Sequence, residues 1–319
     1  MTATDRTIQE LEKEIKKIED GINDFCQLKE FRFKQNIAGA ESPESPEFDD
    51  RDWEVKRNTV WSPKEGPACF RKEIKIPQKL EGISLSGNPL ELHFLFPSGV
   101  EVFWNGKSLY HHKFWADMVA TSLVLTEELV PNQSHFLTFK TPPGDGLGTF
   151  GAWFSIPKVE KYLLEIQTLA AQFRFAQTIL KKNKDCSLLA TLKKAGSLLK
   201  IEWLKKRAWP EILNNVKEIE EVLEPLRSLA KRYRVHLIGH SHIDMNWLWD
   251  YQDTKNICCR DFDTVERLMA EYPGLTFSQD QAHIYSIVEE NCPEVFPACR
   301  KEWKKAGGKL PSMPGQKGI

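Results

Sequence analysis

The stretch R-Y-R-V-H-L-I-G-H-S-H-I-D, residues 232–244, gives the clearest indication of the fold. Residues 235–238 form a short, mostly apolar run, which is typical of a parallel strand buried on both faces. Helical spacing of apolar residues follows over 262–269, then L-T-F-S at 275–278 predicts a second strand, and 284–288 suggests another helix. The order strand, helix, strand, helix indicates an α/β layer or barrel.

Two histidines and an aspartate alternate where the first predicted strand ends, at His240, His242 and Asp244. Because side chains alternate along a strand, all three project to one side, at the carboxyl end where α/β active sites form. Imidazole nitrogen and carboxylate oxygen are ligands that zinc, cobalt and manganese accept. His242 and Asp244 therefore predict half of a divalent metal site. The alternative is a histidine satisfied by the backbone and an aspartate that caps the next helix.

Trp247 and Trp249 follow the candidate ligands directly. Large aromatic side chains are poor loop residues unless they are buried or used, and an indole face fits the C–H surface of a sugar ring. A metal that holds vicinal hydroxyls beside an aromatic platform suggests a carbohydrate site. Since Trp249 has a strong alternative role in the core, only Trp247 is predicted to bind substrate.

The rest of the chain divides into three parts by pattern. Apolar residues at steps of three and four predict an amphipathic helix over residues 5–31, and a Glu/Ser/Pro-rich linker completes the range 1–52. Short apolar runs between turn signals, including Asn105-Gly106, predict a β-sandwich over 53–157. Its tryptophans could line a sugar groove, although core packing is the expected role for most of them. A helical connector is predicted over 158–232.

Composition narrows the class of protein. The chain has 319 residues, of which 41% are hydrophobic, and its net charge of -1 makes no electrostatic case for nucleic acid or a membrane surface. Neither a signal peptide nor an apolar run long enough to cross a membrane is evident, so we expect a cytoplasmic protein. The seven cysteines include no C-x-x-C pair, which favours free thiols over a disulfide framework.

The segment G-H-S-H-I-D-M-N-W-L-W, residues 239–249, together with F-S-Q-D-Q-A-H-I-Y, resembles the start of the catalytic domain of glycoside hydrolase family 38. These are the class II α-mannosidases, and the resemblance is to the cytosolic type. It implies a seven-stranded β/α barrel over 233–319, metal ligation by His242 and Asp244, and mannose stacked on Trp247. It also implies oligosaccharide substrates with terminal α-mannosides, a retaining mechanism with an aspartate nucleophile, and possible homo-oligomers.

The sequence departs from the family pattern near its end. The family's nucleophile lies in a segment resembling G-G-x-W-V-E-x-D-x-N, where this chain reads G-G-K-L-P-S-M-P-G-Q-K-G-I. A β/α barrel takes about 250 residues, far more than 233–319 supplies. We therefore expect an incomplete barrel, a nucleophile beyond Ile319 and no catalytic residue within the chain. This would be a truncated mannosidase, inactive by itself.

Two other functions remain open. Amidohydrolases also begin with H-x-H on a first barrel strand, in which case His240 and His242 would be the metal pair. Alternatively, the protein binds glycans through its β-sandwich without catalysis, and the barrel segment is vestigial.

Overall fold

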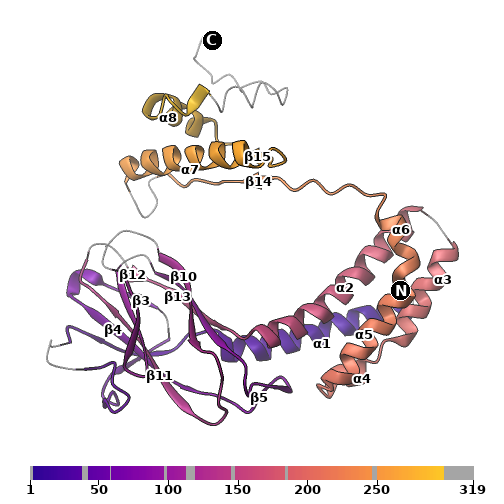
Figure 1. Cartoon of the computed structure of the whole chain (residues 1–319), viewed down its shortest axis with the longest axis horizontal. Helices are drawn as coiled ribbons and strands as arrows, with labels where there is room; N and C mark the ends of the chain where they lie inside the picture. The colour runs from indigo at the N-terminus through magenta and orange to yellow at the C-terminus, as the bar shows by residue number, and fades with distance from the viewer. Residues whose placement is uncertain are drawn as a thin grey trace. The chain divides into compact units, whose positions relative to one another are not determined.

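The computed structural model describes residues 3–37, 42–57, 59–96, 99–112, 119–144, 148–183, 186–245 and 250–297. The chain divides into two compact units, Met1–Arg232 and Tyr233–Ile319 (Figure 1). Both contain helices and strands, so the fold is mixed α and β. None of the described helices is both long and apolar enough to cross a lipid bilayer.

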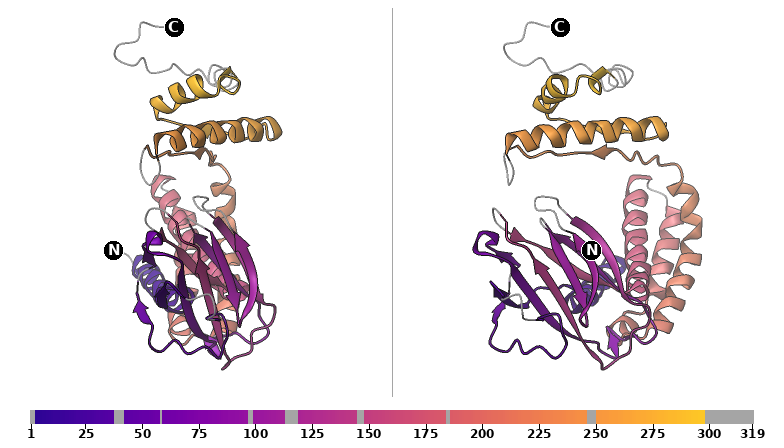
Figure 2. Two further views of the ribbon diagram at one scale, coloured as in Figure 1. Left: turned by 90° about the vertical axis from the view of Figure 1, so that its left-hand side faces the viewer. Right: turned by 60° about the vertical axis from the view of Figure 1, so that its left-hand side comes forward.

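Two antiparallel sheets form the sandwich in the first unit (Figure 2). One has the order β2 (Glu54–Lys56), β1 (Phe31–Gln35), β4 (Ala68–Lys75), β11 (Ser134–Thr141), β8 (Val100–Trp104), β9 (Lys107–His112). The other has the order β10 (Val119–Thr126), β7 (Leu90–Phe96), β13 (Gly151–Ser155). Two short pairs, β3 (Val60–Trp61) with β12 (Gly148–Thr149) and β5 (Lys79–Leu80) with β6 (Ile83–Ser84), and a 3-10 turn, η1 (Pro63–Glu65), complete this part.

Alternation along the strands explains the core. In β7 every second residue is buried, as expected for a strand with one face on the core. Phe139 of β11 packs against Phe94 and Phe96 of β7, with ring centroids 6.0 and 5.2 Å apart, and thereby joins the two sheets. Trp61 and Trp104 are buried, in agreement with the predicted core role, whereas Trp153 is 40% exposed. Trp115 lies outside the described residues.

The hairpin predicted from Asn105-Gly106 is confirmed. It joins β8 to β9, and both residues have positive φ, 51° and 81°. This conformation matches the twist of two antiparallel strands, and asparagine and glycine adopt it at low cost.

The Glu/Ser/Pro-rich segment differs from the solvated linker that the sequence suggested. Arg71 of β4 is 1% exposed; its Nη2 donates to the Ser45 carbonyl, and its Nη1 lies 2.5 Å from Asp50 Oδ2. Glu44 forms an ion pair with Lys140 of β11. The segment therefore packs on the sheet, because side chains distant in sequence supply it with partners. Strand β1 also places part of the range 1–52 inside the sandwich.

Helices follow the sandwich, as predicted: α2 (Pro157–Asn183), α3 (Cys186–Leu198), α4 (Ile201–Lys205), α5 (Trp209–Leu223), the 3-10 turn η2 (Glu224–Leu226) and α6 (Arg227–Ala230). Their buried apolar residues belong to the same core cluster as those of the sheets. Glu81, between β5 and β6, links the two parts: its carbonyl accepts from Trp209 Nε1 at 2.7 Å, and its carboxylate accepts from Arg207 Nε at 2.5 Å. The helices are thus part of the first unit's core.

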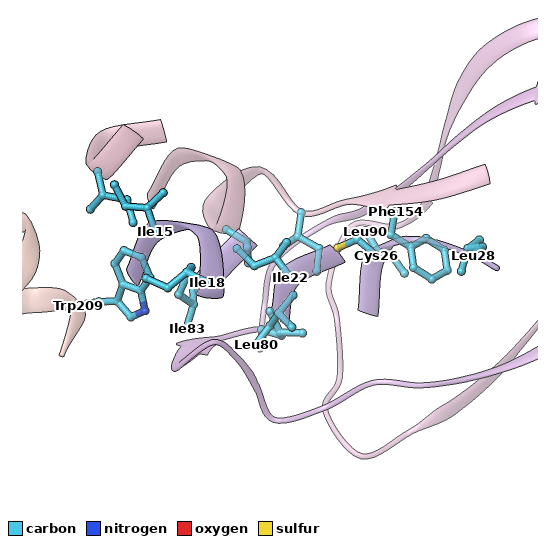
Figure 3. Close-up of a cluster of buried hydrophobic side chains, with 14 of the residues drawn as sticks. Ile15, Ile18, Ile22, Cys26, Leu28, Leu80, Ile83, Leu90, Phe154 and Trp209 are labelled. Carbon is cyan, nitrogen blue, oxygen red and sulfur yellow. The ribbon is translucent and has the colours of Figure 1, made fainter. Parts of the chain in front are cut away.

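The amphipathic helix α1 (Ala3–Cys26) connects sheets and helices. Its apolar residues at helical spacing form one stripe, and that stripe is buried. Figure 3 shows Ile18 beside Trp209 and Ile83, and Cys26 beside Phe154. Helix α1 contacts α2, α3 and α4 as well as β5 and β13. The first helix therefore lies at the centre of this unit.

The second unit has the predicted order of elements: β14 (Gly239–His240), α7 (Tyr251–Glu271), β15 (Phe277–Ser278) and α8 (Ala282–Asn291). The two strands are parallel. However, the prediction of a strand buried on both faces at 235–238 is wrong, because Val235 and Leu237 are 79% and 86% exposed. The pairing involves only two residues of each strand, and α7 and α8 instead pack around Ile243. The described residues contain no closed barrel.

The expectation that the cysteines are free thiols is correct only in part. Cys26, Cys69 and Cys258 are free and buried, as predicted, but Cys259 of α7 forms a disulfide with Cys292, which follows α8. Burial raises the pKa of the Cys26 thiol to about 12 and that of Cys258 to about 11. These thiols are therefore protonated at neutral pH, and the disulfide fastens α7 to the end of α8.

Candidate functional site

The candidate site lies where two parallel strands give way to helices. Gly239 pairs with Phe277, and His240 pairs with Ser278. Strand β14 is followed by loop residues 241–245 and, further along the chain, by α7, whereas β15 is followed by a short loop and then α8 (Figure 1). Asp250 caps α7 by accepting a hydrogen bond from the Asp253 amide at 2.9 Å. Side chains of the first loop are thus at the carboxyl end of the strand pair.

Two glutamines hold the loop that follows β14. Gln279 Nε2 donates to the Ser241 carbonyl at 2.9 Å. Gln281 makes both bonds to Ile243, accepting from its amide at 3.0 Å and donating to its carbonyl at 2.9 Å. Side-chain amides thereby continue the pairing of β14 with β15 beyond the last backbone pair. The Tyr285 hydroxyl donates to the Gln279 carbonyl at 3.0 Å and ties this arrangement to α8.

This fixed loop orients the two candidate ligands. Ile243 is 3% exposed and packs in the core of the unit, so its neighbours in the chain face outward. His242 Nε2 lies 3.2 Å from Asp244 Oδ1, and the two side chains are 66% and 47% exposed. The structure thus brings together the two residues that the sequence proposed as metal ligands. In the described ranges, no group of three or more His, Cys, Asp or Glu side chains is arranged to hold an ion.

His240 has a different partner. Its Nδ1 lies 2.9 Å from the Ser278 carbonyl, and a carbonyl can only accept. Nδ1 therefore carries the hydrogen, and in the neutral ring Nε2 has the free lone pair. The contacts of the site pair His242 with Asp244 rather than with His240, which favours the H-x-D interpretation over the H-x-H pair of an amidohydrolase.

The structure describes only some of the other polar and aromatic residues near the site. Trp247 and Trp249 lie outside the described residues. Gln281 is the N-cap residue of α8. His283 meets Tyr251 from the start of α7, with Nε2 3.2 Å from the hydroxyl. The sequence interpretation missed Gln279 and Gln281, although the pattern Q-x-Q directly after the second predicted strand could have drawn attention to them.

The match to a family model falls in this second unit. Residues 232–308 match the model of the glycosyl hydrolases family 38 N-terminal domain. Alpha-mannosidase G of Dictyostelium discoideum is 36% identical over 91 residues, which is 25% of this chain and 8% of that protein. Human alpha-mannosidase 2C1 is 32% identical over 89 residues, 26% of this chain and 9% of that protein. The chain therefore aligns with less than a tenth of the length of these relatives.

Solved structures show weaker similarity. A glycosyl hydrolase family 2 member from Bacteroides cellulosilyticus has 15% identity and a TM-score of 0.32, covering 40% of this chain and 21% of that one. A beta-glycosidase from Bacteroides vulgatus has 17% identity and a TM-score of 0.33, covering 41% and 20%. At such low identities and TM-scores, these similarities carry no conclusion about the function of this chain. The resemblance to family 38 class II α-mannosidases predicted from the motif is confirmed by the family match and the two mannosidase relatives.

Proposed function

We propose that the second unit carries the first part of the active site of a metal-dependent, retaining α-mannosidase that acts on terminal α-mannosides of oligosaccharides. One observation carries the proposal: His242 and Asp244 meet at the end of a parallel strand, inside the segment that matches family 38. The relatives named alpha-mannosidase support the choice of substrate. A cytoplasmic location and homo-oligomeric assembly remain predictions.

The donor set fits a divalent cation. His242 Nε2 and Asp244 Oδ1 are close enough to serve one ion, and both side chains reach solvent. Imidazole and carboxylate together suit zinc best, with cobalt and manganese as alternatives. When bound, such an ion would supply Lewis-acid chemistry at the sugar hydroxyls.

The chain's own residues would then have distinct roles. His242 and Asp244 would hold the ion, and Gln281 would fix the backbone between them through its two bonds to Ile243. Trp247 would stack beneath the sugar ring. A retaining glycosidase also needs two carboxyls about 5 to 5.5 Å apart, one as nucleophile and one as acid and base. The matched segment covers less than a tenth of the length of the mannosidase relatives, and His242 and Asp244 supply only two ligands, so residues 1–319 alone should bind metal weakly and hydrolyse little.

Cobalt binding and hydrolysis test this proposal separately. Purified 1–319 is titrated with Co²⁺ by calorimetry, and p-nitrophenyl α-mannoside hydrolysis is followed with Zn²⁺ or Co²⁺. We expect weak cobalt binding that His242→Ala abolishes, and no turnover above background. His236→Ala is the matched control, because His236 is an exposed histidine of the same unit. Equal binding by wild type and His242→Ala would refute the metal role, and metal-dependent turnover would show that residues 1–319 supply both carboxyls themselves.

A further inference from the structure

The outer face of the three-stranded sheet in the first unit carries an ordered set of side chains. Strand registers place Ser122, His93 and Trp153 in one row across β10, β7 and β13. The next row on one side is Val124, Glu91 and Ser155, and on the other Ala120, Leu95 and Gly151. The opposite face of the same strands, with Phe94 and Phe154, is buried in the core. Ser155 is only 5% exposed, so the other eight residues form what we call the outer platform.

An aromatic stack occupies the middle row. The rings of Trp153 and His93 are nearly parallel, 9° apart in plane, with centroids separated by 5.7 Å. Trp153 is 40% exposed although it sits in the middle of a hydrogen-bonded strand. Its strand is held on the other edge too, where Gln27 bridges to Trp153 and the Leu28 amide donates to the Ala152 carbonyl at 3.0 Å. The stack is therefore on a rigid backbone.

Polar groups lie beside the stack. Glu91 Oε2 is 3.5 Å from His93 Nε2, and both side chains remain about one-third exposed, at 32% and 30%. Ser122, across from His93, is exposed. The other neighbours in these rows include alanine, glycine and serine, whose short side chains leave the indole standing above the sheet surface.

We infer that the outer platform binds a hexose unit of a neutral glycan. The C–H face of one sugar ring would lie on the face of the Trp153 indole that is turned away from His93, and hydroxyls of neighbouring units of the same glycan would bond to the Glu91 carboxylate, the His93 ring and the Ser122 hydroxyl. A sugar ring presents an apolar face and hydroxyls at its edge, and a flat aromatic with donors and acceptors beside it matches both.

Other occupants fit less well. One carboxylate next to one imidazole gives no excess positive charge, so an anionic ligand or nucleic acid gains little. A stable protein interface buries about 800 Å² on each side and has an apolar centre. Here the exposed Leu95 and Val124 are in different rows, separated by Glu91 and His93. This inference is independent of the proposed catalytic function, since it concerns the first unit and needs no metal.

Ligand-observed NMR tests the platform with the whole 1–319 chain. Mannotriose, cellotriose and chitotriose are titrated in the presence of EDTA, so that metal binding at His242 and Asp244 cannot contribute. We expect at least one trisaccharide to bind, and Trp153→Ala to weaken its binding about twofold to tenfold, the range of one aromatic stack. His242→Ala should bind normally, so the two proposals fail separately.

Two further variants keep the test decisive. Phe175→Ala removes another exposed aromatic side chain of the same unit and should leave binding unchanged. Ser122→Arg places a long side chain next to the stack at an exposed position, and should weaken binding even if Trp153→Ala fails to fold. Absence of binding by all three sugars, or unchanged binding in Ser122→Arg, overturns the inference. A shift from dimer to monomer in Trp153→Ala during sedimentation, without sugar binding, would identify the platform as a protein interface instead.

Discussion

Arg71 and Asp50 form a salt bridge, Nη1 to Oδ2 at 2.5 Å, in which the arginine is 1% exposed and the aspartate side chain 17% exposed. The guanidinium also lies over the Phe136 ring, 4.0 Å from its centroid. Such a pair is sensitive to the loss of one partner, because the remaining charge stays buried without compensation.

Asp50→Ala should therefore destabilise the first unit by ~3 to 5 kcal/mol. Arg71→Met, which fills a similar volume without a charge, should cost less than Asp50→Ala. Urea unfolding followed by circular dichroism measures both, with Asp49→Ala as control, because Asp49 pairs with the exposed Arg51 at the surface. A smaller effect for Asp50→Ala than for Arg71→Met would show that the buried charge is not the main cost.

Gln281 holds the backbone between the two candidate ligands, so its loss should loosen them. We expect Gln281→Ala to weaken Co²⁺ binding about tenfold, comparable with the loss of an outer hydrogen-bond partner in metal sites. Calorimetry measures the affinity, and Gln252→Ala on the exposed part of α7 is the control. Unchanged affinity in Gln281→Ala, with the melting temperature also unchanged, would contradict a positioning role.

His135 predicts a dependence of stability on pH. Burial lowers the pKa of His135, and its Nδ1 accepts from Asn105 Nδ2 at 2.8 Å, which requires the ring to lack a proton there. The unfolded chain therefore binds a proton more readily than the folded one as pH falls. The contribution of His135 is fully present above about pH 6.5 and is lost as pH falls toward its lowered folded pKa.

Thermal melts at pH 7.5 and pH 5.5 test this dependence. Wild type should lose more stability than His135→Gln between the two values, while His111→Gln, at an exposed position, should behave as wild type does. An equal loss in wild type and His135→Gln would exclude His135 as the source.

The Cys259–Cys292 disulfide closes a loop with a sequence separation of 33. Its reduction should destabilise the second unit by about 3 to 4 kcal/mol, from the loop-closure entropy of the unfolded chain. Peptide mapping without reductant should recover the two cysteines in one cross-linked peptide, and Cys259→Ser should melt at the temperature of the reduced protein. Separate peptides for Cys259 and Cys292 would refute the bond.

In wild type under native conditions, Cys26 and Cys258 should resist alkylation, since burial raises their pKa.

The sequence pattern predicted the elements that depend on interactions between residues near one another in the chain. The stripe of α1 follows from residue spacing, and the β8–β9 hairpin follows from the positive φ that asparagine and glycine tolerate. Long-range partners were not predictable in this way. Nothing near residue 45 indicates that Arg71 will pack against it, and nothing near Ile243 indicates that Gln281 will complete its hydrogen bonds.

In the candidate site, too, local features were predictable from the sequence and long-range contacts were not. H-x-D at a strand end was sufficient to predict that His242 and Asp244 meet, because alternation along the chain is local. The buried strand at Val235 was not correctly predicted, since an apolar run becomes buried only where other elements cover it. The disulfide was missed because pairing of Cys259 with Cys292 depends on how α7 and α8 pack.

The central position of α1 has a consequence for biosynthesis. Helix α1 is synthesised before all the elements that it contacts, and three of them, α2, α3 and α4, emerge more than a hundred residues later. Until those helices emerge, β5 and β13 can cover only part of the apolar face of α1, and an exposed apolar face favours chaperone binding and misassembly. Folding of the whole first unit must therefore wait for the segment around Trp209, which closes over Ile18 at the end (Figure 3).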